Sequence, residues 1–361
     1  MNSTNQKTPT DRDKAGLRGT VRSVIEERTD PGFTDADGNT YPASDTWNKT
    51  EYDREGRVSA TYWRAPARDH GPYALIATRY TYTASGQLLK LTVGTDGKIE
   101  SQTDYNYDDH GRLKSINNSN DPNNPIAFRY DSNGKKTKIA IEKPVELPDG
   151  TGAVSSSGRR LFEDGINEMV IREGGSTITQ YDELDRPSEV QLHDISGTLT
   201  SRAIRVYDQQ GRVAEEKMVM ADPLALIPGL QKKVLQDAAE AHQLRDQITA
   251  FLGGSEMWST RYKYDDQGRK ILTIRNTFNH IAETISTTYN DHGDVIKEVT
   301  LYSASRTGNP AADETSNSET VYFYEYDASG NWTRQRISSR ELPDGTLKDL
   351  GNEVRRTIEY Y

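Results

Sequence analysis

The side chains that could carry out chemistry in this chain are six histidines and 55 acidic residues, and no cysteine is present. The lack of cysteine excludes thiolate nucleophiles and thiolate metal sites. The sequence also contains no G-x-S-x-G elbow, no H-E-x-x-H pair and no P-loop. These observations predict no catalytic residue, no metal site and no cofactor, and they favour a protein that is not an enzyme.

Some acidic and histidine residues are candidates for metal binding or catalysis, but their positions favour ordinary turns. The stretch 35–40 (DADGNT) clusters oxygen ligands, but it lacks the spacing and the closing Glu of a calcium loop, which favours an ordinary turn. His110 and His292 each stand just before a glycine in a repeated turn, where an exposed polar residue is expected. The Asp pairs at 108–109 and 265–266 fall in the same repeated turn, so repetition explains them without catalysis.

Aromatic residues suggest a second kind of chemistry. Aromatic rings can stack on the apolar faces of sugars while Asp or Asn bonds the hydroxyls. The three strongest tryptophans are joined by two tyrosines that alternate with Trp258 onto one strand face, although packing is the alternative role for each. The candidate ligand-binding residues are Trp63, Trp258, Tyr262, Tyr264 and Trp332.

The elements that must position these side chains carry a recurring six-residue pattern. It begins with Tyr and usually Asp, continues with two variable residues, and ends with usually Gly and a polar residue. Neighbouring copies lie 30, 25, 23, 51, 26, 57, 25 and 37 residues apart, so a period near 25 runs along the chain. We interpret 51 as two periods around one degenerate copy, and 57 and 37 as insertions. The copies begin at Tyr52 (YDREGR), Tyr82 (YTASGQ), Tyr107 (YDDHGR), Tyr130 (YDSNGK), Tyr181 (YDELDR), Tyr207 (YDQQGR), Tyr264 (YDDQGR), Tyr289 (YNDHGD) and Tyr326 (YDASGN).

Each copy reads as the end of one strand and the turn into the next. Tyr favours strands, Asp opens a turn by bonding its own backbone, and Gly supplies a positive φ. An alternating apolar and polar segment then follows, for example 112–116 (RLKSI). Each unit is therefore predicted to be an antiparallel hairpin, and the motif tyrosines are predicted to be mainly structural.

One segment, 222–254, departs from strand alternation. Apolar residues recur there at intervals of three and four, and Gly253-Gly254 supplies a stop, which together predict a helix. Such a helix must bury its apolar stripe. It could plug the concave face of the sheet, or it could be a lid over a pocket or a docking helix for a partner.

The tandem YDxxGR hairpins resemble the YD-repeat, or RHS-repeat, family from about Leu17 to Tyr361. The resemblance implies an all-β fold in which tandem antiparallel hairpins form a long curved or coiled sheet, here with one inserted helix. Large members wrap the sheet around a toxin domain or display it at a cell surface. This sequence is shorter than those members, and we expect no further domain after the last repeat. We therefore expect a small bacterial member without a toxin domain, with a flexible tether at 1–16 and the repeat array at 17–361.

Composition fits a thin sheet with much exposed surface. Hydrophobic residues make up 33% of the chain, and the mean hydropathy is −0.85. The net charge of −10 argues against a nucleic-acid partner. No apolar stretch is long enough to span a membrane and no signal peptide is visible. The polar start, 2–10, is like the tether of a bacterial lipoprotein, so we hypothesise an exported protein (periplasmic, cell-surface or secreted) whose precursor carries a leader and a lipid anchor.

The sequence thus predicts a non-enzymatic binding or scaffold protein that presents a curved sheet to a glycan or protein partner at the bacterial surface or outside the cell. The first alternative is an enzyme, such as a glycan-active hydrolase, lyase or cyclase, with a pocket between the inserted helix and the concave sheet. The second alternative is an accessory or immunity protein for a related toxin.

Overall fold

The computed structural model describes residues 9–34, 38–65, 73–142, 159–160, 168–169, 175–193, 196–221, 223, 238–251, 254–277, 280–302 and 317–361. The elements within them are α1 (Asp11–Lys14), β1 (Val21–Asp30), β2 (Phe33–Thr34), β3 (Thr40–Tyr41), β4 (Ser44–Tyr52), β5 (Val58–Ala65), β6 (Ala74–Tyr82), β7 (Leu88–Thr95), β8 (Lys98–Tyr107), β9 (Leu113–Asn118), β10 (Asp121–Tyr130), β11 (Lys136–Glu142), β12 (Arg159–Arg160), β13 (Glu168–Met169), β14 (Gly175–Tyr181), β15 (Pro187–His193), β16 (Leu199–Tyr207), β17 (Val213–Met220), α3 (Ala238–Phe251), β18 (Glu256–Tyr264), β19 (Lys270–Thr277), β20 (His280–Tyr289), β21 (Val295–Tyr302), β22 (Ser318–Tyr326), β23 (Trp332–Glu341) and β24 (Lys348–Tyr360).

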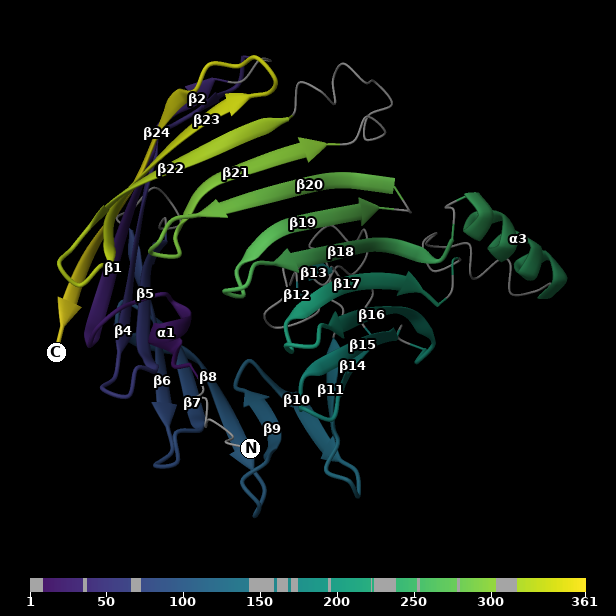
Figure 1. Cartoon of the computed structure of the whole chain (residues 1–361). Helices are drawn as coiled ribbons and strands as arrows, with labels where there is room; N and C mark the ends of the chain where they lie inside the picture. The colour runs from purple at the N-terminus through teal and green to yellow at the C-terminus, as the bar shows by residue number, and fades with distance from the viewer. Residues whose placement is uncertain are drawn as a thin grey trace, which may run out of the picture.

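Twenty of these strands form one closed antiparallel sheet, a barrel drawn in Figure 1. From β4 to β24 the barrel strands pair in chain order, and β1 pairs with both β24 and β4, so that Val24 lies between Ile358 and Thr50. The predicted all-β antiparallel class is confirmed. The predicted open, curved or coiled sheet is wrong, because β1 joins the two ends of the array and pairs the backbone groups that two free edges would expose.

The 51-residue gap between Tyr130 and Tyr181 holds an insertion. β11 pairs directly with β14, with Thr137 opposite Gln180. The two-residue strands β12 and β13 pair only with each other. The prediction of a degenerate copy in this gap is therefore wrong, since no described strand between β11 and β14 enters the barrel.

The nine motif turns all lie at one end of the barrel, here called the motif rim. They join β4 to β5, β6 to β7, and so on to β22 and β23, which is every second connection. In an antiparallel sheet, alternate connections share one end. α3, which stands between β17 and β18 in the chain, lies beyond the opposite rim in Figure 1.

In seven of the nine motif turns an Asp side chain organises the backbone, as the copy at Tyr107 illustrates. Asp108 Oδ1 accepts hydrogen bonds from the backbone N–H groups of His110 (2.9 Å) and Arg112 (2.8 Å), and Arg112 Nε donates to Asp108 Oδ2 at 2.8 Å. The backbone hydrogen bond from Arg112 is the main cause that lowers the pKa of Asp108. Gly111 has φ +73°, as the turn prediction required.

The motif tyrosines tie each hairpin to the one before it. Six of them donate their hydroxyl hydrogen to the backbone carbonyl that follows the preceding turn, at 2.6–2.9 Å. Each such bond contributes roughly 0.5–1.5 kcal/mol. The structural role predicted for these tyrosines agrees with this ladder. The pairs are Tyr82 to Val58, Tyr107 to Leu88, Tyr130 to Leu113, Tyr207 to Pro187, Tyr264 to Val213 and Tyr289 to Lys270.

The motif arginine completes the link between neighbouring hairpins. Arg186 is bonded to Asp182 of its own turn and lies over the ring of Tyr207 in the next copy, 4.0 Å from its centroid. Arg57, Arg112, Arg212 and Arg269 stack in the same way on Tyr82, Tyr130, Tyr264 and Tyr289. A Cβ added at Gly211 would lie 3.0 Å from Arg186 Nη1, so this glycine gives the arginine room as well as a φ of +82°.

The N-terminal segment links the first and the last motif turns across the seam, which is where β24, β1 and β4 meet. Arg12 N–H donates to the Gly56 carbonyl at 3.0 Å, in the first motif turn. Arg18 N–H donates to Asn331 Oδ1 at 2.7 Å, in the last motif turn, and Asn331 Nδ2 donates to the Arg18 carbonyl at 2.9 Å. Residues 9–16, expected to belong to a tether, thus include α1 and contact the barrel, whereas residues 1–8 lie outside the described residues.

The two faces of the sheet differ in what they bury. The face that carries Tyr52 buries large apolar side chains, including Val190, Leu192 and Met218, which form a core cluster with Ala203. Leu17 packs on Tyr52, and α1, just before it, lies on the inner side of β4 and β5 in Figure 1. We call this the inner face. Side chains buried on the outer face are small, namely Ser23, Ala60, Ala77, Ser259 and Ser338.

The predicted helix is present as α3, but it does not plug the barrel. Figure 1 shows α3 beyond the ends of β17 and β18, outside the ring. Its stripe residues Leu244 and Ile248 pack on Ala241 of the same helix. The prediction that this stripe covers the concave face is therefore wrong for Ala238–Phe251, and 224–237 and 252–253 lie outside the described residues.

Candidate binding surface on the inner face

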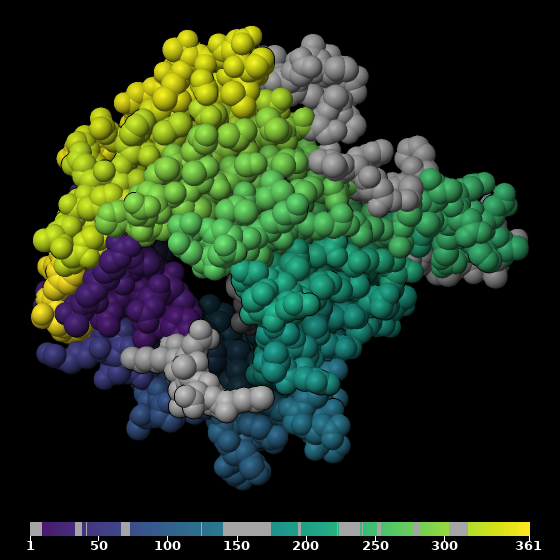
Figure 2. All heavy atoms as spheres, in the orientation of Figure 1, coloured from purple at the N-terminus to yellow at the C-terminus, as the bar shows by residue number. Residues whose placement is uncertain are grey.

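The strand registers bring all five predicted ligand-binding residues to the same face of the sheet. Trp258 and Tyr262 lie opposite Thr277 and Thr273, and Trp63 lies opposite Asn48. Tracing these cross-strand pairs around the barrel assigns the five residues to the inner face. Figure 2 shows that the molecule is hollowed within the ring. The five residues nevertheless come from three separate regions, β5, β18 and β23, and do not form one cluster.

The two tyrosines are engaged by neighbouring side chains. Tyr264 donates its hydroxyl to the Val213 carbonyl at 2.6 Å, and the Arg212 guanidinium lies 4.5 Å from its ring centroid. Tyr262 donates to Glu216 Oε2 at 3.0 Å, and Lys270 Nζ lies 4.2 Å from its ring centroid. Both rings therefore hold the wall together, which leaves little of them for a ligand.

Two of the three tryptophans also serve packing. Trp258 packs against the cluster that contains Met218. The Arg356 guanidinium lies 3.4 Å from the ring centroid of Trp332. The ring centroids of Tyr324 and Trp332 lie 5.9 Å apart. These contacts favour packing, the alternative role predicted for both residues.

Trp63 differs from the other four residues. Its relative exposure is 43%, although it stands on the inner face. Its cross-strand partners are Asn48 on β4 and Ile76 on β6. Of the five predicted residues, Trp63 offers the most open ring to a ligand inside the barrel.

A buried polar group next to Tyr262 is the strongest candidate for chemistry. Arg205 Nε donates to Glu216 Oε1 at 2.9 Å, and both side chains are at most 3% exposed. Burial raises the pKa of Tyr262 well above its usual range, and the Glu216 carboxylate raises it further. Arg205, Glu216 and Tyr262 line a cavity of about 520 Å³. Because their polar atoms bond one another, they stabilise the wall and leave no group poised as a general acid or base.

Cross-strand ion pairs recur on the inner face. Arg356 Nε donates to Glu26 Oε1 at 2.7 Å, and Arg275 bonds Glu283. Tyr322 donates to Glu298 at 2.6 Å. Threonines line the same face on β4, β5 and β6, where Thr50 lies opposite Thr61 and Thr61 lies opposite Thr78. The described inner wall therefore combines hydroxyl groups with compensated charges.

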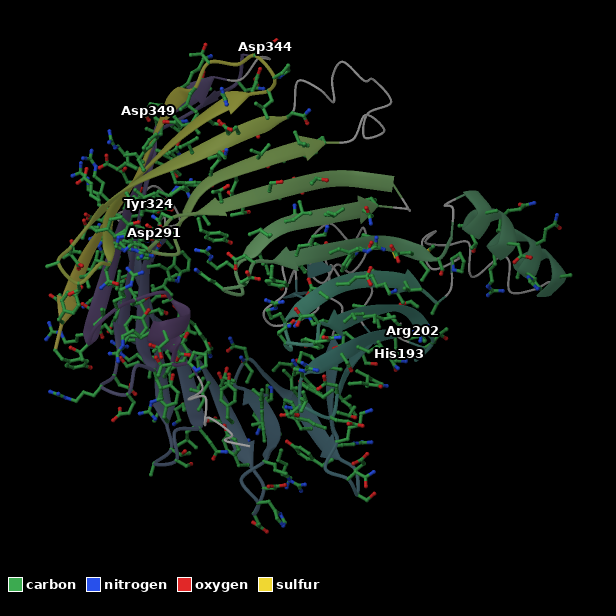
Figure 3. All side chains as sticks on the ribbon, viewed as in Figure 1. His193, Arg202, Asp291, Tyr324, Asp344 and Asp349 are labelled. Atoms are coloured by element: carbon green, nitrogen blue, oxygen red, sulfur yellow. The ribbon has the colours of Figure 1, made fainter. Side chains whose placement is uncertain are left out.

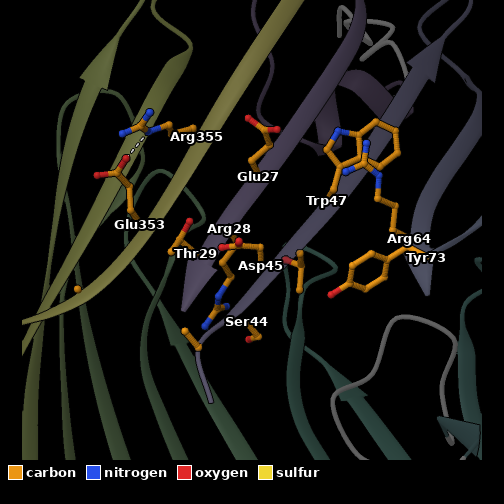
Figure 4. Close-up of a pocket in the computed structure, with 13 residues that line it drawn as sticks. Glu27, Arg28, Thr29, Ser44, Asp45, Trp47, Arg64, Tyr73, Glu353 and Arg355 are labelled. Carbon is orange, nitrogen blue, oxygen red and sulfur yellow. Dashed lines mark hydrogen bonds and ion pairs between the residues drawn. The ribbon is translucent and has the colours of Figure 1, made fainter. Parts of the chain in front are cut away.

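A second cavity, of about 810 Å³, lies near the rim opposite the motif turns (Figure 4). Glu27, Asp45 and Trp47 are outer-face positions of β1 and β4, and the Arg64 guanidinium covers the Trp47 ring at 4.7 Å. The outer face can also be followed at β15 and β16, where Figure 3 shows His193 and Arg202 at the margin of the molecule. Trp47 is thus a tryptophan of the outer face.

The remaining sequence candidates stay apart in the structure. His110 and His292 occupy motif turns, as expected, and the His292 ring stacks on Tyr326 with centroids 4.2 Å apart. Positions 35–37 of the calcium-like stretch lie outside the described residues. Among the residues described, no group of three or more His, Asp or Glu side chains is arranged to hold a metal ion. In the same part of the chain, no helix is long and apolar enough to cross a membrane.

Sequence reasoning missed the residues that hold the barrel together. The Arg at the last motif position recurs in five copies, and this recurrence was the available signal for the Arg–Tyr stack. Arg205 and Glu216 had no such signal, because they meet only through the pairing of β16 with β17. Arg12 and Arg18 were missed because Arg12 lies in the segment predicted to be a tether and Arg18 in the segment predicted to begin the repeat array.

Comparison with known proteins gives distant likenesses. No protein-family model and no curated protein matches the chain. A TcdB2-TccC3-TEV crystal structure is similar at 14% identity over 86% of this chain, with a TM-score of 0.31, and this chain spans 16% of that one. A porin-like protein from Bacteroides uniformis is similar at 12% identity over 94% of this chain and 98% of its own, also with a TM-score of 0.31. A Photorhabdus luminescens Tc holotoxin pore is similar at 12% identity over 90% of this chain and 18% of its own, with a TM-score of 0.23. At these scores, we draw the function from the residues of this chain, and the YD-repeat resemblance rests on its nine motif copies.

Proposed function

We propose that this chain is a non-enzymatic scaffold of the YD-repeat type that binds a glycan or protein partner on the inner face of its barrel. The observation that carries the proposal is closure. The sheet ends pair through β1, and a face lined with aromatic, hydroxyl and paired charged groups surrounds a hollow. The hydroxyl and amide groups of this face can bond a hydrated guest.

The enzyme alternative loses the pocket on which it was based. It required a cleft between the inserted helix and the concave sheet, and the described turns of α3 lie outside the ring. The best remaining group, Arg205 with Glu216 and Tyr262, is at most 8% exposed. This burial and mutual bonding support a structural role.

The cellular setting is part of the same proposal. We place the protein outside the bacterial cytoplasm, in the periplasm, at the cell surface or secreted, with a lipid anchor in its precursor. The support is the polar, cysteine-free composition and the polar N-terminal segment. An accessory or immunity role beside a related toxin stays the alternative partner assignment.

Because the chain has no cysteine, a single introduced thiol can test the enclosed binding face. Thr78→Cys places a thiol on the inner face and Arg79→Cys places one on the outer face, at adjacent positions of β6. We expect a small maleimide to modify both variants and a 20-kDa polyethylene-glycol maleimide to modify only Arg79→Cys. Equal modification of both by the large reagent would contradict an enclosed inner face.

Protection by added guests then tests binding. The probes are neutral hexasaccharides and a pool of unstructured 15-residue peptides, each added before the small maleimide. We expect at least one probe class to slow modification of Thr78→Cys without changing Arg79→Cys. Protection of neither variant by either class would count against the binding role.

A further inference from the structure

We propose that Trp63 and Asn48 form a binding subsite for a neutral oligosaccharide on the inner face of the barrel. This inference rests on the proposed function and names the class of guest. It starts from the one candidate ring whose face is open, Trp63, with a relative exposure of 43%.

Asn48 provides the polar half of the subsite. It lies directly opposite Trp63 across β4 and β5, and cross-strand partners have Cβ atoms about 4.5–5.5 Å apart. The Asn48 side chain is exposed and forms no hydrogen bond with another described residue. An amide carries two donors and an acceptor oxygen, so it can bond the vicinal hydroxyls of a sugar while the indole stacks on the apolar face of the ring.

A cavity next to Asn48 extends the subsite along the wall. It has a volume of about 430 Å³, and its lining includes Thr46, Asn48, Gln335 and Trp332. Gln335 Nε2 donates to the Tyr324 hydroxyl at 2.9 Å, which leaves its carbonyl oxygen available as an acceptor. This space is adequate for a sugar unit beside the one stacked on Trp63.

The charges around this cavity favour a neutral guest. Glu26 is paired with Arg356 at 2.7 Å, and Arg28 is paired with Asp30 at 2.8 Å. A sulfated or uronic-acid glycan would need to disrupt these pairs to find a counter-charge, whereas a neutral sugar can bond their outer oxygen and nitrogen atoms as they stand.

The other tryptophans show why the subsite is at Trp63. The ring of Trp332 is covered by Arg356 at 3.4 Å, and the ring of Trp47, on the outer face, is covered by Arg64 at 4.7 Å. Trp258 packs in the core cluster. Trp47 therefore serves as a matched control, since it lies one position along β4 from Asn48 and faces the opposite side.

Titration calorimetry with cellohexaose, maltohexaose and chitohexaose tests the inference, with a heparin-derived hexasaccharide as the charged comparison. We expect at least one neutral hexasaccharide to bind, Trp63→Ala to weaken its affinity at least tenfold, and Asn48→Ala to weaken it about fivefold. Trp63→Phe, which keeps an aromatic ring, should recover part of the loss, and Trp47→Ala should bind like the unaltered chain. Circular dichroism confirms that each variant is folded.

Three results would overturn the inference: binding only of the charged hexasaccharide, neutral binding that Trp63→Ala leaves unchanged, or no hexasaccharide binding at all. The thiol experiment separates this failure from failure of the proposed function. If peptides protect Thr78→Cys while no hexasaccharide binds, the scaffold role stands with a protein partner and the sugar subsite is wrong.

Discussion

Two regions of the barrel are closed by different means. In the wall formed by β15 to β18, Arg205 and Glu216 stand 11 residues apart in the chain and bond beside a compact apolar cluster. At the seam, Val24 and Tyr52 share a cluster with Ile358, and Arg18 bonds Asn331 across 313 residues. The wall joins hairpins that are neighbours in sequence, whereas the seam joins the two ends of the array.

This difference has a consequence for folding and opening. Local pairs lose little chain entropy when they form, while a contact across 313 residues needs the rest of the ring in place. We therefore expect the wall to form early and the seam to close last. The seam is also where the barrel should open first, since no covalent connection joins β24 to β1.

The largest effect should come from unpairing the buried charge in the wall. Glu216→Ala leaves Arg205 without its carboxylate in a site where both side chains are at most 3% exposed, so we expect a loss of about 3–5 kcal/mol in the free energy of unfolding. Urea denaturation followed by circular dichroism measures it. The matched control is Glu215→Ala, the adjacent outer-face residue, whose partner Arg261 is 57% exposed, and it should cost about 1 kcal/mol or less. Equal losses would mean that burial does not distinguish the two carboxylates.

A smaller and local effect is expected at the seam. Asn331→Ala removes the side chain that bonds both the N–H and the carbonyl of Arg18, which should cost about 1–3 kcal/mol. Hydrogen exchange should become faster in β1 and β24 and stay unchanged in β15 to β18. Ser329→Ala, in the same turn, is the control. Uniformly faster exchange would show that the seam and the wall open as one unit.

High pH should weaken the hydrogen bonds that the motif tyrosines donate at the motif rim. Burial raises the pKa of Tyr82 and of Tyr326 to about 12, against about 10 in an unfolded chain. A folded pKa above the unfolded value means that the contribution is complete below pH 10 and is lost as the pH rises toward 12. We expect the melting temperature to fall over this range, together with tyrosinate absorbance at 295 nm. A melting temperature that stays constant up to pH 12 would contradict a stabilising role for these hydrogen bonds.

The smallest effect should come from repairing an imperfect motif copy. The copy at Tyr82 has Thr83 and Gln87 where most others have Asp and Arg. The double change Thr83→Asp with Gln87→Arg should allow an Asp–Arg bond and an Arg stack on Tyr107, for a gain of roughly 0.5–1 kcal/mol. Gln87→Arg alone lacks the carboxylate and should gain less. If the single change performs as well, the turn carboxylate does not position the arginine.

The sequence by itself determined the hairpins and their turns. The interactions that form each Tyr-Asp-x-x-Gly turn are made within the turn itself, since Asp108 bonds the turn backbone and Gly111 takes φ +73° without strain. Even the exception is local, because Asp185 takes the glycine position at φ +60° in a residue type that tolerates it. Strand alternation likewise determined that Trp258, Tyr262 and Tyr264 share a face.

Only the tertiary structure decided closure, the place of the helix and which aromatic ring is open. Closure depends on β1 pairing with two strands that lie at opposite ends of the array, and no local pattern encodes a partner more than 300 residues away. The helix pattern predicted an apolar stripe but not the surface that receives it. Trp63 and Trp332 look alike in sequence, and they differ because Arg356, brought in by β24, covers one ring and leaves the other exposed. Side-chain accessibility is a property of neighbours from distant strands, so it appears only once the barrel is closed.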